Sequence, residues 1–148
     1  MQPDWILVAN ASEARLLQQD PGSPMAVLQA FHHPASRLHS SELGDAERGR
    51  EGSDRRHGAS AYSAHIEPQR KEHVRFAREL AASLEQGASQ GRCNRIHVFA
   101  ASPFLGELKA ELGDATRRRL AGAYDLDLSS LGLAQIEERV RAVAAHPH

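Results

Sequence analysis

Arginine and glycine gather in the middle of this 148-residue chain in a pattern suited to phosphate contact. The pattern comprises Arg48-Gly49-Arg50 and, shortly after it, Arg55-Arg56-His57-Gly58. A guanidinium group can form two parallel hydrogen bonds with phosphate oxygens, and glycine lets the backbone approach them closely. Acidic residues lie among these arginines, so a charged, solvated surface is the alternative. The candidate residues for RNA or phosphate contact are Arg48, Gly49, Arg50, Arg55, Arg56 and Gly58.

A second basic cluster, Arg117-Arg118-Arg119, offers the same chemistry later in the chain. Glu111 and Asp114 precede it and would neutralise part of its charge. Stacking of nucleic-acid bases has little support, because Tyr62 is the only aromatic residue close to the central arginines.

Histidine is frequent, but its spacing fits no established metal-site pattern. The nine histidines include His32-His33 with His39, and His57, His65 and His73 at intervals of eight. Zinc sites on helices use histidines four residues apart, and zinc fingers combine histidine with cysteine. We therefore expect no metal site.

Other catalytic arrangements are also missing from the sequence. A two-metal nuclease needs carboxylates at the ends of its central strands, where this chain has Asn10 and Ser102. The serines form no G-x-S-x-G elbow, and the glycines form no nucleotide-binding loop, so we expect no cofactor. Two arginines near Cys93 could lower the pKa of its thiol, but a surface or edge thiol without a catalytic role fits better.

Composition restricts the class of protein. The 18 Lys and Arg residues nearly balance the 19 Asp and Glu residues, which argues against a polyanion binder over the whole surface. A single cysteine excludes an intramolecular disulfide and fits a reducing compartment. No apolar run reaches the ~20 residues needed to span a bilayer, and we find no signal-peptide pattern. We expect one cytoplasmic domain over residues 1–148, without membrane contact.

The elements that would position these residues follow from apolar periodicity and turn signals. Residues 36–66 are charged and glycine-rich, which predicts a long mobile loop. Strands are expected at residues 5–9, 14–18, 27–31, 96–101 and within 120–128. Helices are expected at 67–87, from Pro103 with Ser102 as N-cap, and from Ser129 or Ser130. This order predicts an α/β fold with a ribonuclease-H-like mixed five-stranded sheet, in which a three-strand meander precedes alternating helices and strands and helices pack on the faces.

Several short motifs, in this order, resemble the bacterial host-attachment protein family. They are Ile6-Leu7-Val8-Ala9-Asn10-Ala11, Ala14-Arg15-Leu16, Ser41-Glu42-Leu43 with Asp45, Arg48-Gly49-Arg50, Phe76-Ala77-Arg78-Glu79-Leu80 and Pro103-Phe104-Leu105-Gly106-Glu107-Leu108. The signature positions are Asn10, Phe104, Leu105, Gly106 and Glu107. The family usually has an aspartate at the position of Asn10. The family is similar to the middle domain of the archaeal and eukaryotic peptide chain release factor.

That resemblance implies a loop, ahead of the first long helix, that enters the peptidyl-transferase centre. In the release factor, a Gly-Gly-Gln tripeptide in this loop helps to place water for hydrolysis of peptidyl-tRNA. The corresponding residues 55–62 contain no Gly-Gly-Gln. Because the glycine pair and the glutamine carry the chemistry in the release factor, we do not expect hydrolysis here. A hydrolase would need His57 or Tyr62 in place of the missing glutamine.

The leading hypothesis is a non-catalytic RNA- or ribosome-associated accessory protein, with residues 36–66 as the contact element and the ribosome or tRNA as partner. One alternative is a peptidyl-tRNA hydrolase-like release or rescue factor with a degenerate loop. Another is a protein-interaction module that uses the Phe104-Leu105-Gly106 turn, although these side chains could equally pack a helix onto the sheet. The oligomeric state is left open.

Overall fold

The computed structural model describes residues 2–33 and 58–144 of the chain. In order, the elements are β1 (Asp4–Ala9), β2 (Glu13–Gln19), β3 (Ala26–His32), α3 (Gly58–Ser89), β4 (Ile96–Ala100), α4 (Phe104–Glu111), α5 (Asp114–Arg119), β5 (Leu120–Asp125) and α6 (Leu133–Ala144). All five expected strands are present, and their bounds differ from the expected ones by few residues.

The strands form one sheet in the order β3-β2-β1-β4-β5. β1 pairs antiparallel with β2, and β2 pairs antiparallel with β3, which gives the expected meander. β1 and β4 are parallel, as are β4 and β5. β1 is apolar on both faces because it lies at the centre of the sheet, and its residues from Trp5 to Ala9 are buried. The α/β fold class and the mixed five-stranded sheet are confirmed.

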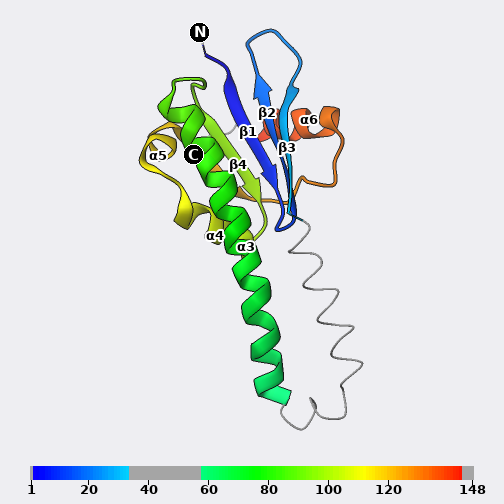
Figure 1. Ribbon diagram of the computed structural model, residues 1–148. Coiled ribbons are helices and arrows are strands. Elements are labelled where there is room, and N and C mark those ends of the chain that lie inside the picture. Colours follow the sequence, from blue (N-terminus) through cyan, green and yellow to red (C-terminus); the bar gives the residue numbers. More distant parts are fainter. Residues whose placement is uncertain (1, 34–57, 145–148) are drawn as a thin grey trace.

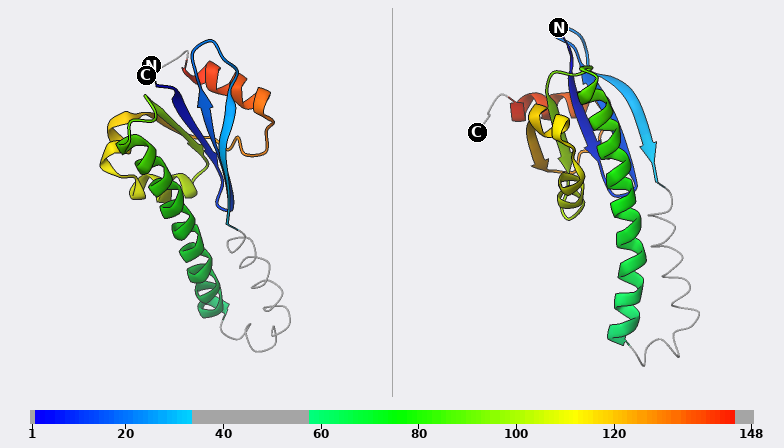
Figure 2. Two further views of the ribbon diagram at one scale, coloured as in Figure 1. Left: turned by 45° about the horizontal axis from the view of Figure 1, so that its top comes forward. Right: turned by 60° about the vertical axis from the view of Figure 1, so that its left-hand side comes forward.

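Helices cover both faces of the sheet and create two hydrophobic cores (Figures 1 and 2). α3, α4 and α5 pack on one face, where Phe76, Leu84 and Leu108 are fully buried. α6 packs on the other face, where Ile136 meets Val8 and Phe99. The expected apolar stripe of α6 is thus its contact surface with the sheet.

α3 begins earlier than the sequence suggests, so the expected loop over residues 36–66 is wrong for residues 58–66. The helix starts at Gly58, and Pro68, expected in its first turn, lies inside it. Alanine-rich sequence favours a helix there, and the helix continues through Pro68 although an interior proline removes one backbone donor and crowds the preceding turn. Figure 1 shows that the N-terminal half of α3 projects well beyond the sheet.

The end of α3 also differs from expectation. Gly87, expected to stop the helix, lies inside it, and a β-carbon at Gly87 would collide with the Trp5 ring. Gly91 has a φ of 69°, and the Arg92 N–H donates to the Gly87 carbonyl at 2.9 Å. Gly91 therefore ends the helix, because glycine adopts this left-handed conformation without strain.

Ser102 does not cap α4 as expected. Pro103 occupies the N-cap position of α4, without a side-chain cap. The Ser102 hydroxyl instead donates to Oδ2 of Asp125 at 2.7 Å, and its backbone N–H donates to Oδ1 at 3.0 Å. A charged carboxylate at the end of β5 is the stronger acceptor and takes both donors.

Candidate nucleic-acid interface

The central arginine-glycine segment lies largely outside the described residues. This applies to Arg48, Gly49, Arg50, Arg55, Arg56 and His57. Gly58 is the first residue of α3, and Tyr62 also belongs to this helix. The roles assigned to these residues stay predictions.

The three side chains of the second arginine cluster make different contacts. Arg117 turns to the C-terminal end of α4, where its Nε donates to the Leu112 carbonyl at 2.9 Å and its Nη2 to the Lys109 carbonyl at 2.8 Å. Carbonyl groups at the end of a helix lack partners within it, so this cation satisfies them. Arg117 is therefore a structural residue.

Arg118 and Arg119 line an open surface hollow of about 610 Å³. Its other lining residues are Asn94, Arg95, Leu120 and Ala121. Nη1 of Arg119 donates to the Cys93 carbonyl at 2.9 Å, which holds this guanidinium in place. Within residues 2–33 and 58–144, Arg95 and Arg118 make no ion pair within 4.0 Å. The hollow thus combines one anchored guanidinium group with two that make no ion pair within 4.0 Å among the described residues, although the charge of Arg118 also acts on the Glu85 carboxylate.

Sheet topology brings these distant residues together. Ile96 begins β4 and pairs with Leu120, which begins the parallel strand β5. Residues that precede two neighbouring parallel strands lie at the same edge, so Arg95 comes close to Arg119. The run of arginines made Arg118 and Arg119 candidates from the sequence. Arg95 and Asn94 were not among the candidates, because no local sequence pattern connects them with Arg118 and Arg119.

Glu85 of α3 holds the short helix that carries these arginines. Its carboxylate accepts hydrogen bonds from the Ala115 N–H at 3.2 Å and from the Thr116 N–H and hydroxyl, each at 2.9 Å. The bond from the Thr116 N–H is the main cause of the lowered pKa of Glu85. A β-carbon at Gly113 would clash with this carboxylate, so glycine is needed for the close approach.

A second group of polar residues lies at the carboxyl ends of the parallel strands, where sheets of this class often bind ligands. Asp125 ends β5, and hydrogen bonds from Ser102 lower the pKa of its carboxyl. Oδ1 of Asp127 accepts a hydrogen bond from the hydroxyl of Ser129. Neither aspartate was expected as a site residue from the sequence. The available signal was that each directly follows an apolar residue in a stretch typical of a strand. Among the described residues no group of three His, Cys, Asp or Glu side chains is placed to hold a metal ion.

Asn10 also lies at the carboxyl ends of the parallel strands, directly after β1. Its Oδ1 accepts the backbone N–H groups of Ser12 at 2.8 Å and Glu13 at 2.9 Å. Its Nδ2 donates to the Ser129 hydroxyl at 3.0 Å. Asn10 therefore closes the turn between β1 and β2 and ties it to the connection ahead of α6.

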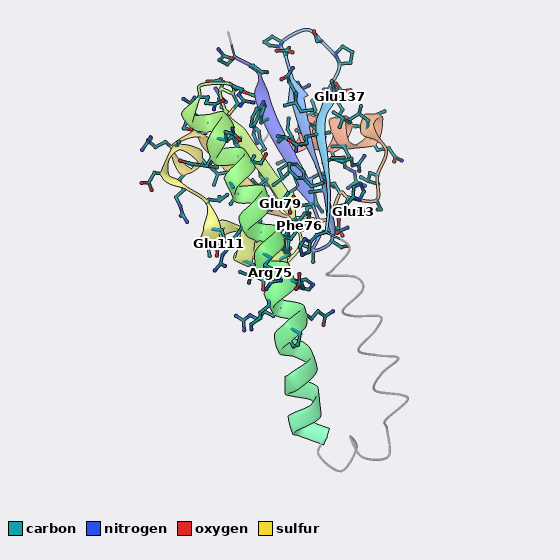
Figure 3. The ribbon with its side chains drawn as sticks, viewed as in Figure 1. Glu13, Arg75, Phe76, Glu79, Glu111 and Glu137 are labelled. Carbon is teal, nitrogen blue, oxygen red and sulfur yellow. The ribbon has the colours of Figure 1, made fainter. Side chains whose placement is uncertain are left out.

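A charged cluster, missed in the sequence, lies where α3 leaves the sheet. Nε2 of His33 is 2.9 Å from Oε1 of Glu72, and Nη1 of Arg75 is 3.0 Å from Oε2 of the same carboxylate. The His33 ring stacks on Phe76, with ring centroids 5.4 Å apart. Figure 3 shows Arg75 and Phe76 near the level at which α3 passes beyond the sheet. The cluster joins the end of β3 to α3.

The family model described as "Protein required for attachment to host cells" matches residues 5–140. The chain belongs to this family. In fold, this host-attachment family member is also similar to the crystal structure of the archaeal translation termination factor aRF1, at a TM-score of 0.49 and 13% sequence identity. The similarity covers 95% of this chain but only 35% of the factor. No curated protein matches this chain by sequence.

Two signature residues of this host-attachment family member are buried. Phe104 is 4% exposed and Leu105 is 7% exposed, and Phe104 stacks on Phe76 with ring centroids 5.9 Å apart. These side chains pack α4 against α3, so an interaction module that presents them on the surface is excluded. Gly106 and Glu107, by contrast, line a surface groove between α3 and α4.

The lone cysteine of the family member differs from expectation as well. Cys93 is fully buried, and burial raises the pKa of its thiol above the ordinary value. A surface or edge thiol is therefore wrong, and the arginines nearby do not produce a reactive thiolate. His97 is also buried, which lowers its pKa, and its Nδ1 lies 3.4 Å from the Tyr124 hydroxyl.

Proposed function

We propose that this host-attachment family member is a non-catalytic RNA-associated protein that binds phosphate groups at the hollow lined by Arg95, Arg118 and Arg119. The carrying observation is that two of these guanidinium groups lack an ion-pair partner within the described part of the chain. Guanidinium groups without a close ion-pair partner attract phosphate and release its counterions on binding. The Glu85 carboxylate acts on Arg118 only from beyond ion-pair distance.

The arginine-glycine segment supplies the second contact in this proposal. Arg48, Arg50, Arg55 and Arg56 precede α3, with Gly49 and Gly58 beside them. α3 projects from the sheet and begins at Gly58, at its far end (Figure 1). A partner with a large phosphate-bearing surface would meet both regions, and the ribosome and tRNA are partners of this kind.

The family description names a requirement for attachment to host cells. We infer that this chain meets the requirement indirectly, from the cytoplasm, by acting on an RNA-containing partner. A single, buried cysteine fits a reducing compartment. Among the described residues, no helix combines the length and apolar character that crossing a membrane requires.

The hollow is tested by binding to purified ribosomes and to tRNA over a salt series. The double variant Arg95→Ala, Arg118→Ala should bind about tenfold or more weakly at low salt. The slope of log affinity against log salt should fall by about 1.4 to 1.8, because each lost phosphate contact contributes about 0.7 on a single strand and about 0.9 on a double helix. Arg139→Ala is the matched control, since Arg139 is an exposed arginine of α6 outside the hollow.

The central segment is tested in the same assay. Alanine at Arg48, Arg50, Arg55 and Arg56 together should also reduce binding and its salt dependence. Binding that is absent, or that does not change with salt, would overturn the RNA proposal. Equal affinities of the Arg95/Arg118 double variant and the Arg139 control would exclude the hollow as the contact site.

A further inference from the structure

β3 is an edge strand of the sheet that no other element of the described residues covers. It is the outermost strand on its side, and six of its seven residues are exposed. Val27 is 49% exposed and Leu28 is 44% exposed, and they are the large apolar side chains that the described structure leaves in solvent. Such an edge readily accepts a further strand.

The sequence of β3 lacks the residues that prevent an edge strand from pairing with another strand. The strand Ala26–His32 contains no Lys, Arg, Asp, Glu or Pro, the residues that commonly block edge-to-edge pairing. The opposite edge, β5, is flanked by Arg118 and Arg119 at its start and ends at Asp125. The two edges therefore differ in their readiness to pair.

The backbone of β3 can continue the sheet. The His33 N–H donates to the Ser12 carbonyl at 2.8 Å, and hydrogen bonds alternate along an antiparallel pair. The backbone groups of Ala30 and His32 therefore point away from β2, towards the open edge. The irregularity in the pairing with β2 lies between Leu16 and Leu17, so residues 29–32 form the regular stretch.

Shallow hollows flank β3 on both faces of the sheet. Ala30 and His32 line one of about 300 Å³, together with Val8 and Leu131. Leu28 and Gln29 line another of about 440 Å³, beside Trp5 and Leu16. Figure 2 shows β3 at the outer margin of the sheet. Both hollows are mixed in character, because Glu13 and Arg15 also line the first and Asp20 and Arg92 the second.

We propose that β3 pairs antiparallel with β3 of a second copy of this chain. A two-fold axis places the strand antiparallel to a copy of itself, and β3 carries no Lys, Arg, Asp or Glu that could repel this copy. Ala30, which is small and points its backbone outward, lies at the axis. Val27 and Leu28 of each copy are then covered by the other.

The expected association is weak. One pair of short strands buries less than the ~1,600 Å² of a standard protein interface. The dimer therefore forms reversibly as the protein concentration rises. Because β3 and β5 are opposite edges of the sheet, the hollow near Arg118 stays open in the dimer.

Light scattering coupled to size exclusion tests the pairing over concentrations up to about 1 mM, the limit for a weak complex. The wild-type mass should rise from 16.2 kDa towards twice this value. Val27→Lys and Leu28→Lys should both keep the monomer mass, while Ala142→Lys, at an exposed position of α6, should behave as wild type. Circular dichroism confirms that each variant is folded.

Cross-linking supplies a second, independent readout. Ala30→Cys should give a covalent dimer with a short thiol cross-linker, whereas Ala142→Cys should not. The wild-type background is low because Cys93 is buried. A wild-type protein that stays monomeric up to about 1 mM overturns the proposal, as does a dimer that survives both lysine variants or fails to cross-link through Ala30→Cys.

Discussion

At the scale of single residues, neighbours in the sequence perform unrelated tasks. Arg117 caps α4 through two carbonyl groups, Arg119 is held by the Cys93 carbonyl, and Arg118 lines the hollow without an ion-pair partner within the described chain. A run of like charges in the sequence therefore identifies only candidate ligand-binding residues. The backbone around each residue decides which side chain is left for a ligand.

Asn10 illustrates a residue whose role follows from its hydrogen bonds. It accepts bonds from Ser12 and Glu13 through one amide oxygen and donates to Ser129 through the amide nitrogen. These contacts engage both the oxygen and the nitrogen of the amide, so we assign the side chain a structural role.

Replacing Asn10 tests this role. Asn10→Ala leaves the part-buried N–H groups of Ser12 and Glu13 without their acceptor, and we expect a loss of about 1–3 kcal/mol in the free energy of unfolding. Asn10→Asp keeps the acceptor and should lose less. Urea unfolding of the three proteins measures both effects, and equal losses in the two variants would contradict the assignment.

At the scale of elements, helices α3 and α5 are positioned by contacts that helix propensity does not reveal. α3 lies so close to β1 that Gly87 touches the Trp5 ring. α5 is short, and Glu85 of α3 accepts three hydrogen bonds at its N-terminal end. A carboxylate is favourable there because the first N–H groups of a helix lack partners within it.

Gly87→Ala separates packing from propensity. In an exposed helix this change would stabilise by up to about 1 kcal/mol. Here the added methyl group collides with Trp5, so we expect destabilisation of about 1–3 kcal/mol from overpacking. Thermal unfolding measures the change, and Ser89→Ala, at an exposed position near the end of the same helix, is the control. A stabilised Gly87→Ala variant would show that α3 can move away from β1.

The link between α3 and α5 should depend on pH. The pKa of Glu85 is lowered from its ordinary value of 4.5, so the folded state favours the carboxylate. Its stabilising effect is therefore complete above pH 4.5 and is lost as the pH falls through the lower, folded-state pKa. Glu85→Gln should lower the melting temperature at pH 7, and the difference from wild type should shrink at pH 3. A difference that is the same at both pH values would exclude the charge as its source.

At the scale of the whole molecule, three surfaces differ in charge and shape. The start of β4 and β5 gathers arginines, the far edge at β3 is charge-free and exposed, and α3 extends beyond the sheet (Figure 1). These surfaces lie on separate parts of the fold. If the two proposals hold, a substitution at Arg118 should weaken the proposed RNA binding alone, and a substitution at Val27 should weaken the proposed self-pairing alone.

The amino-acid sequence by itself determined the order of the elements except for α5 (Asp114–Arg119), a short helix that it did not predict. Apolar runs marked β1 and β4, the turn after β2 marked the hairpin, and spacing of apolar residues marked α3 and α6, because local patterns reflect which faces are buried. Its errors came where local signals conflict: Pro68 was taken as a helix start and Gly87 as a helix end. The central arginines were recognised as candidates on residue type alone.

Only the tertiary structure decided which residues meet. Arg95 joins Arg118 and Arg119 because β4 and β5 run parallel, and Cys93 is buried because α3 and the sheet close over it. Parallel strands are joined by crossovers, so residues at their starts are separated by a whole helical connection in the sequence. No local pattern records such a contact, and the charge of the hollow exists only once the sheet has formed.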